Sequence, residues 1–110
     1  MKKIFIAAFM FVSTFGTNVM ADGHAIKMGI ILGFTGPIES LTPAMRDSAK
    51  LAFEEASASG SLLGGKKISV LEADSTCVDS AAATAAAEGL ISQGVAAIMG
   101  ADCSGVTGAI

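Results

Sequence analysis

Three short apolar runs dominate the hydrophobic pattern of the chain beyond its first 25 residues. They are "IKMGIILG" (26–33), "KISVLEA" (67–73) and "VAAIMG" (95–100). Each run is rich in Ile, Val, Leu or Ala and does not alternate between apolar and polar positions. Such runs are typical of strands that are buried on both faces, as in a parallel sheet. The pattern therefore predicts three buried strands.

Helical periodicity fills the first gap between these runs. In "TPAMRDSAKLAFEEASAS" (42–59), Thr42 is a candidate N-cap and Pro43 occupies the first helical position. Apolar residues recur at helical spacing on one face, and charged residues are expected on the other face. The apolar face comprises Met45, Ala49, Ala52, Phe53 and Ala56, and the charged face comprises Arg46, Lys50 and Glu54.

A second helix is predicted in "DSAAATAAAEGLISQG" (79–94). Asp79 or Ser80 is its candidate cap, and Gly94 is expected to end it. The small residues of its apolar stripe favour close packing on a sheet. This stripe comprises Ala83, Ala86, Ala87, Leu90 and Ile91.

The predicted order of elements is β-α-β-α-β, followed by the start of a third helix at Ser104. This alternation predicts an α/β fold, a parallel sheet with helices on both faces and right-handed crossovers. The chain stops at Ile110, about two turns into the third helix. Open α/β sheets normally have more strands than this. We therefore expect a fragment of a larger domain.

The first 21 residues have the features of a secretory signal peptide. Two lysines precede an apolar stretch at 4–15, and Val19 and Ala21 have the spacing of a cleavage site. The alternative is a transmembrane anchor, which needs about 20 apolar residues, more than this stretch provides. We expect cleavage near Ala21 and export of residues 22–110.

The charge of the exported part disfavours polyanionic partners. Residues 22–110 contain five basic and ten acidic residues, a formal charge of −5. Nucleic acids and anionic membrane surfaces are bound by basic patches. The chain also has no Trp or Tyr on which bases could stack. We therefore expect no nucleic acid as a partner.

The two cysteines gain significance from the predicted export. Cys77 and Cys103 are the only cysteines of the chain, so one intramolecular pairing exists. Disulfides form and persist in oxidising compartments. A disulfide is therefore predicted, with two free buried thiols as the alternative.

Two glycine-rich segments do not fit nucleotide-binding loops. "GSLLGGKK" (60–67) resembles a phosphate loop, but Lys67 stands in place of Ser or Thr and the segment precedes a strand. "GIILGFTGP" (29–37) lacks the dinucleotide-binding spacing, and Pro37 blocks the expected helix start. No nucleotide cofactor is predicted.

The segment "DCSG" (102–105) contains a candidate nucleophile but no catalytic partners. The only histidine, His24, lies near the predicted mature N-terminus, and no G-x-S-x-G pattern surrounds Ser104. One histidine and scattered carboxylates also provide too few ligands for a metal site. The sequence therefore predicts no catalytic residue, no metal, no cofactor and no enzyme activity.

Ser104 follows the third predicted strand at the start of a helix. Ligands of doubly wound sheets bind outside the carboxyl ends of the strands, and helix N-termini attract anions. A serine there can donate to a carboxylate, and Gly105 allows close backbone approach. Ser104 can instead cap its own helix. The local sequence leaves both roles open.

Several short motifs occur in a characteristic order between Ile26 and Ile110. They are "IKMGIILG", "TGP" (35–37), "AKLAFEEA", "SGSLLGGKKISVLEAD", the D-x-x-C pattern at 74–77, and "VAAIMGADCS". In this order the chain resembles the N-terminal part of the periplasmic leucine/isoleucine/valine (branched-chain amino acid) binding proteins of ABC importers. The resemblance implies a partial N-terminal lobe (22–110) of a two-lobed periplasmic protein. Such a protein is expected to be a monomer that binds one amino acid between its lobes and delivers it to a membrane permease.

The resemblance also implies roles for individual residues. Cys103 is expected to be disulfide-bonded to Cys77, and Ser104 to meet the α-carboxylate of the ligand. Leu41 stands at a position that contacts the ligand side chain and is often aromatic in relatives, and Thr42 stands where relatives often have glycine. Asp102 lies near the cleft by position, where its charge can meet an amino group.

The remaining ligand contacts are expected beyond Ile110, in later strands and the second lobe. A chain of 110 residues is therefore expected not to bind amino acids with useful affinity. Two other functions are compatible with the fold. A ligand-sensing receptor ectodomain requires a membrane segment and a cytoplasmic domain downstream, and an exported hydrolase requires a downstream Asp and His around Ser104.

Overall fold

The computed structural model describes residues 25–110, so the predicted signal peptide and His24 lie outside the described residues. The elements are β1 (Ile26–Leu32), α1 (Thr42–Ala58), η1 (Leu62–Gly64), β2 (Ile68–Asp74), α2 (Ser80–Ser92), β3 (Ala97–Gly100) and α3 (Ser104–Thr107). The predicted order of strands and helices is confirmed. Where a boundary was predicted, it differs from the observed one by at most two residues.

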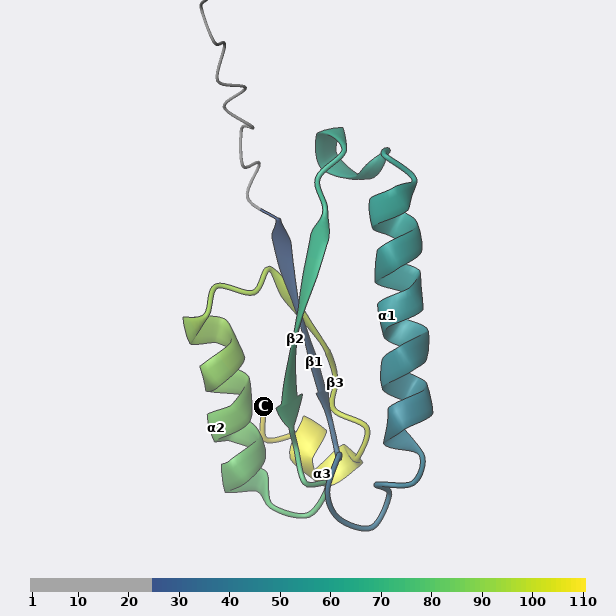
Figure 1. The fold of residues 1–110 in the computed structure, drawn as a ribbon. Helices are drawn as coiled ribbons and strands as arrows, with labels where there is room; N and C mark the ends of the chain where they lie inside the picture. The colour runs from purple at the N-terminus through teal and green to yellow at the C-terminus, as the bar shows by residue number, and fades with distance from the viewer. Residues whose placement is uncertain (1–24) are drawn as a thin grey trace, which may run out of the picture.

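The three strands form a parallel sheet with β1 in the centre and β2 and β3 on either side (Figure 1). In the register, Ile26 is opposite Ile68 and Met28 is opposite Ala97. β1 is therefore paired along both edges. Its largely apolar sequence, in which Lys27 is the one charged residue, follows from this position, because helices cover both faces of a central parallel strand.

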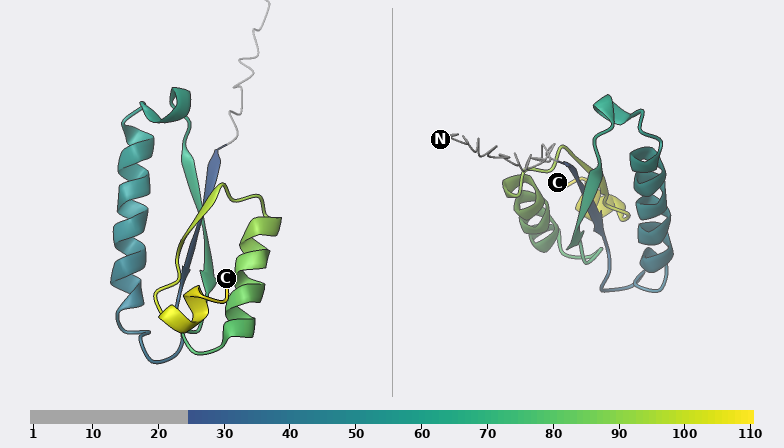
Figure 2. Two further views of the ribbon diagram at one scale, coloured as in Figure 1. Left: turned by 180° about the vertical axis from the view of Figure 1, so that it is seen from behind. Right: turned by 45° about the horizontal axis from the view of Figure 1, so that its top comes forward.

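The two long helices cover opposite faces of the sheet, α1 on one side and α2 on the other (Figures 1 and 2). The strand order explains this arrangement. The first crossover moves from β1 to β2, and the second returns past β1 to β3. Right-handed crossovers in opposite directions place their helices on opposite faces. The predicted α/β architecture is thus confirmed.

The face under α2 holds a compact apolar cluster. Ile31, Ala87 and Leu90 are almost fully buried there, and parts of β2 and β3 pack around them. Gly29 leaves room for this contact, since a Cβ at that position would lie 3.0 Å from the Leu90 Cδ1 atom. The predicted apolar stripe of α2 is wrong at one position, because Ile91 is 62% exposed.

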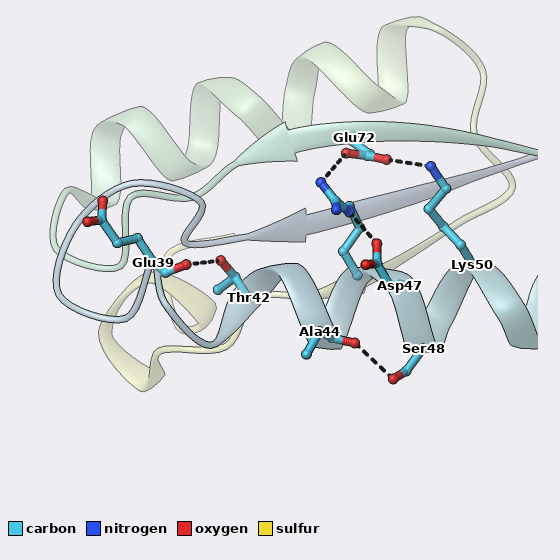
Figure 3. A network of polar contacts seen from close by, with 8 residues as sticks. Glu39, Thr42, Ala44, Asp47, Ser48, Lys50 and Glu72 are labelled. Atoms are coloured by element: carbon cyan, nitrogen blue, oxygen red, sulfur yellow. Dashed lines mark hydrogen bonds and ion pairs between the residues drawn. The ribbon is translucent and has the colours of Figure 1, made fainter.

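The face under α1 is more polar than the helical periodicity predicts. Ile30 and Leu32 are buried and alternate with Ile31, so they point to the opposite side of the sheet from α2. Above them, Lys50 Nζ lies 3.2 Å and Arg46 Nη1 4.0 Å from carboxylate oxygens of Glu72 in β2 (Figure 3).

These contacts correct the predicted orientation of α1. Arg46 and Lys50 face β2 instead of the opposite side, and Met45 and Ala52 are exposed. The long side chains can cover the sheet with their methylene groups while their charged ends stay near water. The acidic residue Glu72 on β2 supplies a partner for these charged ends. Such a partner on a distant segment cannot be predicted from the hydrophobic periodicity of the helix alone.

The predicted capping role of Thr42 is also wrong. Thr42 is the first residue of α1 and is fully buried, and its hydroxyl donates to the carbonyl oxygen of Glu39 at 3.2 Å (Figure 3). Leu41 precedes the helix, and no side chain caps it. Pro43 lies in the first turn, as predicted, where its missing N–H costs no helical hydrogen bond.

Asp79 is the N-cap of α2, and its removal is a test of the fold. Its carboxylate accepts hydrogen bonds from the N–H groups of Ala81 and Ala82 at 2.9 and 3.0 Å. We expect Asp79→Ala to lower the free energy of unfolding by about 1 kcal/mol, the usual cost of losing such a cap. Urea unfolding followed by circular dichroism measures this loss. Ser80→Ala is the matched control, and an equal loss in that variant would contradict the assignment.

Candidate functional site

Three loops meet at the edge of the sheet formed by the carboxyl ends of the strands. They span 33–41, 75–79 and 101–103, and they lie with α3 at the lower end of the molecule in Figure 1. Leu41 closes the first loop, and Ser104 follows the third. The parallel sheet therefore brings both predicted ligand-contacting residues to one edge, where ligands of open α/β sheets bind. We refer to this region as the strand-end edge.

A disulfide joins two of these loops. Cys77 and Cys103 are bonded, with their Cα atoms 5.2 Å apart. Of the two states that the sequence left open, the structure contains the disulfide. Because β2 and β3 flank β1, the bond links the outer strands across the end of the central one. A Cβ at Gly33 would lie 3.2 Å from the Cys77 Cβ, so the bond also approaches the first loop closely.

Ser104 does not cap its own helix. It is the first residue of α3, whereas Cys103 occupies the N-cap position, and no side chain makes a capping hydrogen bond there. Ser104 is exposed. Its hydroxyl is therefore free of the capping role and is accessible at the strand-end edge. α3 has only four residues, so its dipole contributes little to the binding of an anion.

Leu41 presents an apolar side chain at the same edge. It is 61% exposed although it immediately precedes a helix that packs on the sheet. Its backbone is fixed, because its N–H donates to the carbonyl oxygen of Ile38 at 2.9 Å. An exposed leucine on a fixed backbone can contact an apolar ligand group without rearrangement of the main chain.

Asp102, to which the sequence assigned no definite role, holds the end of β1. Its Oδ2 atom accepts a hydrogen bond from the N–H of Gly33 at 2.9 Å. Its Oδ1 atom is buried and has no hydrogen-bond partner among the described residues. The carboxylate thus lies within the strand-end edge and contacts the backbone of loop 33–41 just after β1.

Asp74, the last residue of β2, is hydrogen-bonded to both adjacent loops. Its carboxylate accepts from the Thr35 hydroxyl at 2.6 Å, the Thr35 N–H at 3.3 Å and the Thr76 N–H at 2.8 Å. Partial burial by itself raises the pKa of Asp74, but the hydrogen bonds from Thr35 and Thr76 outweigh it, so the pKa lies below its ordinary value. The carboxylate is therefore ionised at neutral pH.

The backbone at this edge is unusually close and partly strained. Gly36 has φ +98°, and a Cβ there would lie 2.5 Å from the carbonyl oxygen of Thr76. Thr76 and Cys77 have φ values of 59° and 70°, which are rare for residues with a side chain and rarer still for a β-branched one. Such conformations persist only where surrounding contacts enforce them. Here the contacts are the Asp74 carboxylate and the disulfide.

The strand-end edge is open to solvent. No enclosed pocket is detected within residues 25–110. The same residues contain no group of three or more His, Cys, Asp or Glu side chains placed to hold a metal ion. No helix in this described part is both long and apolar enough to cross a membrane.

Comparison with known proteins identifies the family. The family model described as periplasmic binding protein matches residues 25–110. The chain therefore belongs to the periplasmic binding protein family. A search of curated protein sequences finds no significant match.

Membership in this family has direct consequences. The proteins of the family are generally not enzymes, and they bind small molecules and work with membrane partners. The family also indicates a periplasmic location. The three-stranded α/β structure agrees with part of an N-terminal lobe of such a protein.

Sequence reasoning missed the residues that hold the edge together. It used Asp74 only as part of a short motif and gave no role to Thr35. The available signal was that Asp74 and Asp102 each end or follow a predicted strand next to the central one. Carboxylates at such positions can reach the backbone of the adjacent loop.

Proposed function

We propose that the chain is part of the N-terminal lobe of a solute-binding protein that captures an amino acid for an ABC importer. Binding of a branched-chain or similar amino acid closes two lobes, and the closed form delivers the ligand to a membrane permease. Such a mechanism uses binding energy to shift the population of the closed state. The protein acts as a monomer, without a cofactor and without catalysis.

The exposed hydroxyl of Ser104 carries this proposal. It lies at the strand-end edge, free of a capping role, next to a cysteine whose backbone is held by a disulfide. A hydroxyl on a fixed backbone is suited to donate to an α-carboxylate, because hydrogen bonds to charged groups are the stronger ones. None of the five basic residues of 22–110 belongs to the three loops of the strand-end edge. A carboxylate bound there is therefore proposed to be recognised by the neutral hydroxyl of Ser104.

Leu41 supports an aliphatic ligand side chain. Its exposed apolar side chain reaches the same edge from the loop that precedes α1. Apolar contact between Leu41 and a branched ligand removes apolar surface from water on both partners. Asp102 adds a negative charge that favours the ammonium group of the same ligand. The ligand is thus proposed to have a carboxylate, an ammonium group and an aliphatic side chain.

The proposal includes residues 1–21 as a signal peptide and residues 22–110 as a partial lobe. Sequencing of the reading frame beyond codon 110 tests the second part, and mass spectrometry of the exported protein tests cleavage near Ala21. A continuing frame with a second α/β lobe and no membrane segment supports the importer role. A downstream membrane segment with a cytoplasmic domain would instead indicate a receptor.

The ligand is tested by a thermal-shift screen of the full-length protein against the twenty amino acids and small amides. We expect aliphatic amino acids to raise the melting temperature, because a ligand that binds only the folded state stabilises it by mass action. No shift with any aliphatic amino acid would refute the proposed ligand class.

Ser104→Ala should weaken amino-acid binding by roughly 1–3 kcal/mol, the range for losing a hydrogen bond to a charged group. Isothermal titration of the full-length protein with the best ligand of the screen measures this loss. Ser61→Ala is the control, since Ser61 is also exposed but lies between α1 and β2, away from the strand-end edge. Unchanged affinity in Ser104→Ala would remove the hydroxyl from the binding site.

A further inference from the structure

We propose that Asp74 and Asp102 are positioning residues of the ligand site, which hold loop 33–41 between them. The two carboxylates come from the ends of the two strands that flank β1, and both accept hydrogen bonds from the loop that follows β1. The inference rests on the proposed function, because it assigns these residues a role in presenting Leu41 and Ser104 to the ligand.

Asp102 fixes the beginning of the loop. The N–H of Gly33, the first residue after β1, donates to Asp102 Oδ2 at 2.9 Å. This N–H is at the end of a strand, beyond the last paired residue Leu32, where no further strand residue is available as an acceptor. A part-buried N–H without a partner is unfavourable. The Asp102 carboxylate therefore provides a hydrogen-bond acceptor for the first residue beyond the paired part of β1.

Asp74 fixes the next turn of the loop. Thr35 donates to it with both its N–H and its hydroxyl, at 3.3 and 2.6 Å. The same carboxylate accepts the N–H of Thr76, which holds Thr76 at its positive φ of 59°. Asp74 therefore sets the position of two loops relative to each other, at the place where Gly36 approaches the Thr76 carbonyl oxygen.

These contacts connect the two residues that the ligand is proposed to touch. Leu41 lies at the end of loop 33–41, whereas Ser104 follows Cys103, which is bonded to Cys77 in loop 75–79. Asp74 joins the loop of Leu41 to the loop of Cys77, and Asp102 joins it to the segment just before Cys103. Loss of either carboxylate frees one loop relative to the other and leaves the ligand contacts less well placed.

The test compares alanine and asparagine variants in the full-length protein. Asp74→Ala and Asp102→Ala are each expected to weaken binding of L-leucine about tenfold, because a loop that is no longer held in place must be ordered when the ligand binds. Asp102→Asn should restore part of the affinity, since its amide oxygen can accept the Gly33 N–H but the charge proposed to favour the ligand ammonium group is lost. Asp74→Asn should restore part, because one oxygen still accepts both N–H groups while the Thr35 hydroxyl loses its acceptor.

Glu72→Ala is the matched control. Glu72 lies on the same strand as Asp74, two residues earlier, and its removal changes the net charge by the same amount. Its partners Lys50 and Arg46 are on α1, outside the strand-end edge. We expect Glu72→Ala to bind L-leucine like the unmodified protein. Equal losses of affinity in Glu72→Ala and Asp74→Ala would overturn the inference.

Amide hydrogen exchange without ligand separates this inference from the proposed function. Asp102→Ala should accelerate exchange at Gly33, and Asp74→Ala at Thr35 and Thr76, whereas Glu72→Ala should leave all three unchanged. Unchanged exchange at these amides in both aspartate variants would overturn the inference, whether or not L-leucine binds. Failure of the unmodified protein to bind any amino acid would refute the proposed ligand, whereas the exchange rates separately test whether the two carboxylates hold loop 33–41.

Discussion

Replacing both Cys77 and Cys103 by alanine is expected to lower the free energy of unfolding by about 3.5 kcal/mol, from the chain-entropy estimate for a loop of this length. The bond closes a sequence separation of 26 residues. Its loss gives the unfolded chain conformations that the bond excludes, and it also frees two loops of the strand-end edge in the folded state. Urea unfolding, followed by far-ultraviolet circular dichroism because the chain has no Trp or Tyr, measures the effect.

Reduction provides the control for this prediction. A reductant should destabilise the unmodified protein by a similar amount and should have no effect on the double alanine variant. Labelling of the unfolded, unreduced protein with a thiol reagent should find no reactive cysteine. Two reactive thiols, or equal stability of both proteins under oxidising conditions, would contradict the disulfide's contribution.

The central strand was predictable because its environment is uniform. The predicted burial of the other two strands is wrong, because β2 and β3 are only partly buried at the two sides of the sheet. β1 is paired along both edges and covered on both faces, so nearly every residue from Ile26 to Leu32 is selected for apolar character. The order of elements then determines the sheet, since right-handed crossovers leave few alternatives. The disulfide followed from the predicted export and the presence of two cysteines. The strand and sheet predictions depend on properties that many residues share, whereas the disulfide prediction depends on there being two cysteines and one possible pairing.

The helix faces were less predictable because a helix surface is only partly covered. Lys50 lies over the sheet because Glu72 on β2 is opposite it, and this pairing depends on a contact between distant segments. Arg46 also approaches Glu72, although its closest carboxylate is that of Asp47 on the same helix. Thr42 shows the same limit at the helix start. Its side chain is buried and bonds backward to Glu39, so it cannot act as the exposed cap that its residue type suggests.

The position of the strand-end edge was predicted from the sequence, but the hydrogen bonds that hold its loops together were not. The rule that ligands bind at the carboxyl ends of parallel strands located Ser104, and the family resemblance added Leu41. The hydrogen bonds of Asp74 and Asp102 depend on the pairing of β1 with both neighbours, which brings distant backbone within reach of each carboxylate. The role of Ser104 could be predicted because it depends on the neighbouring sequence. The role of Asp74 was missed because its partner Thr35 is distant in the sequence.

Leu90→Ala is expected to destabilise the protein by about 3 kcal/mol, within the usual range for a buried leucine. Leu90 is 1% exposed and packs with Ile31 and Ala87 over the centre of the sheet. Its truncation leaves a cavity that the neighbouring alanine side chains are too small to fill. Urea unfolding of the variant, compared with the unmodified protein under oxidising conditions, measures the change.

Ile91→Ala is the matched control, since it removes a similar volume from the next residue of the same helix. Ile91 is 62% exposed, so its truncation removes little buried apolar surface and is expected to change the stability by less than about 1 kcal/mol. The helical pattern placed both residues on the apolar stripe, whereas the structure buries only Leu90. Equal losses in the two variants would show that both side chains are buried in solution, as the periodicity alone implies.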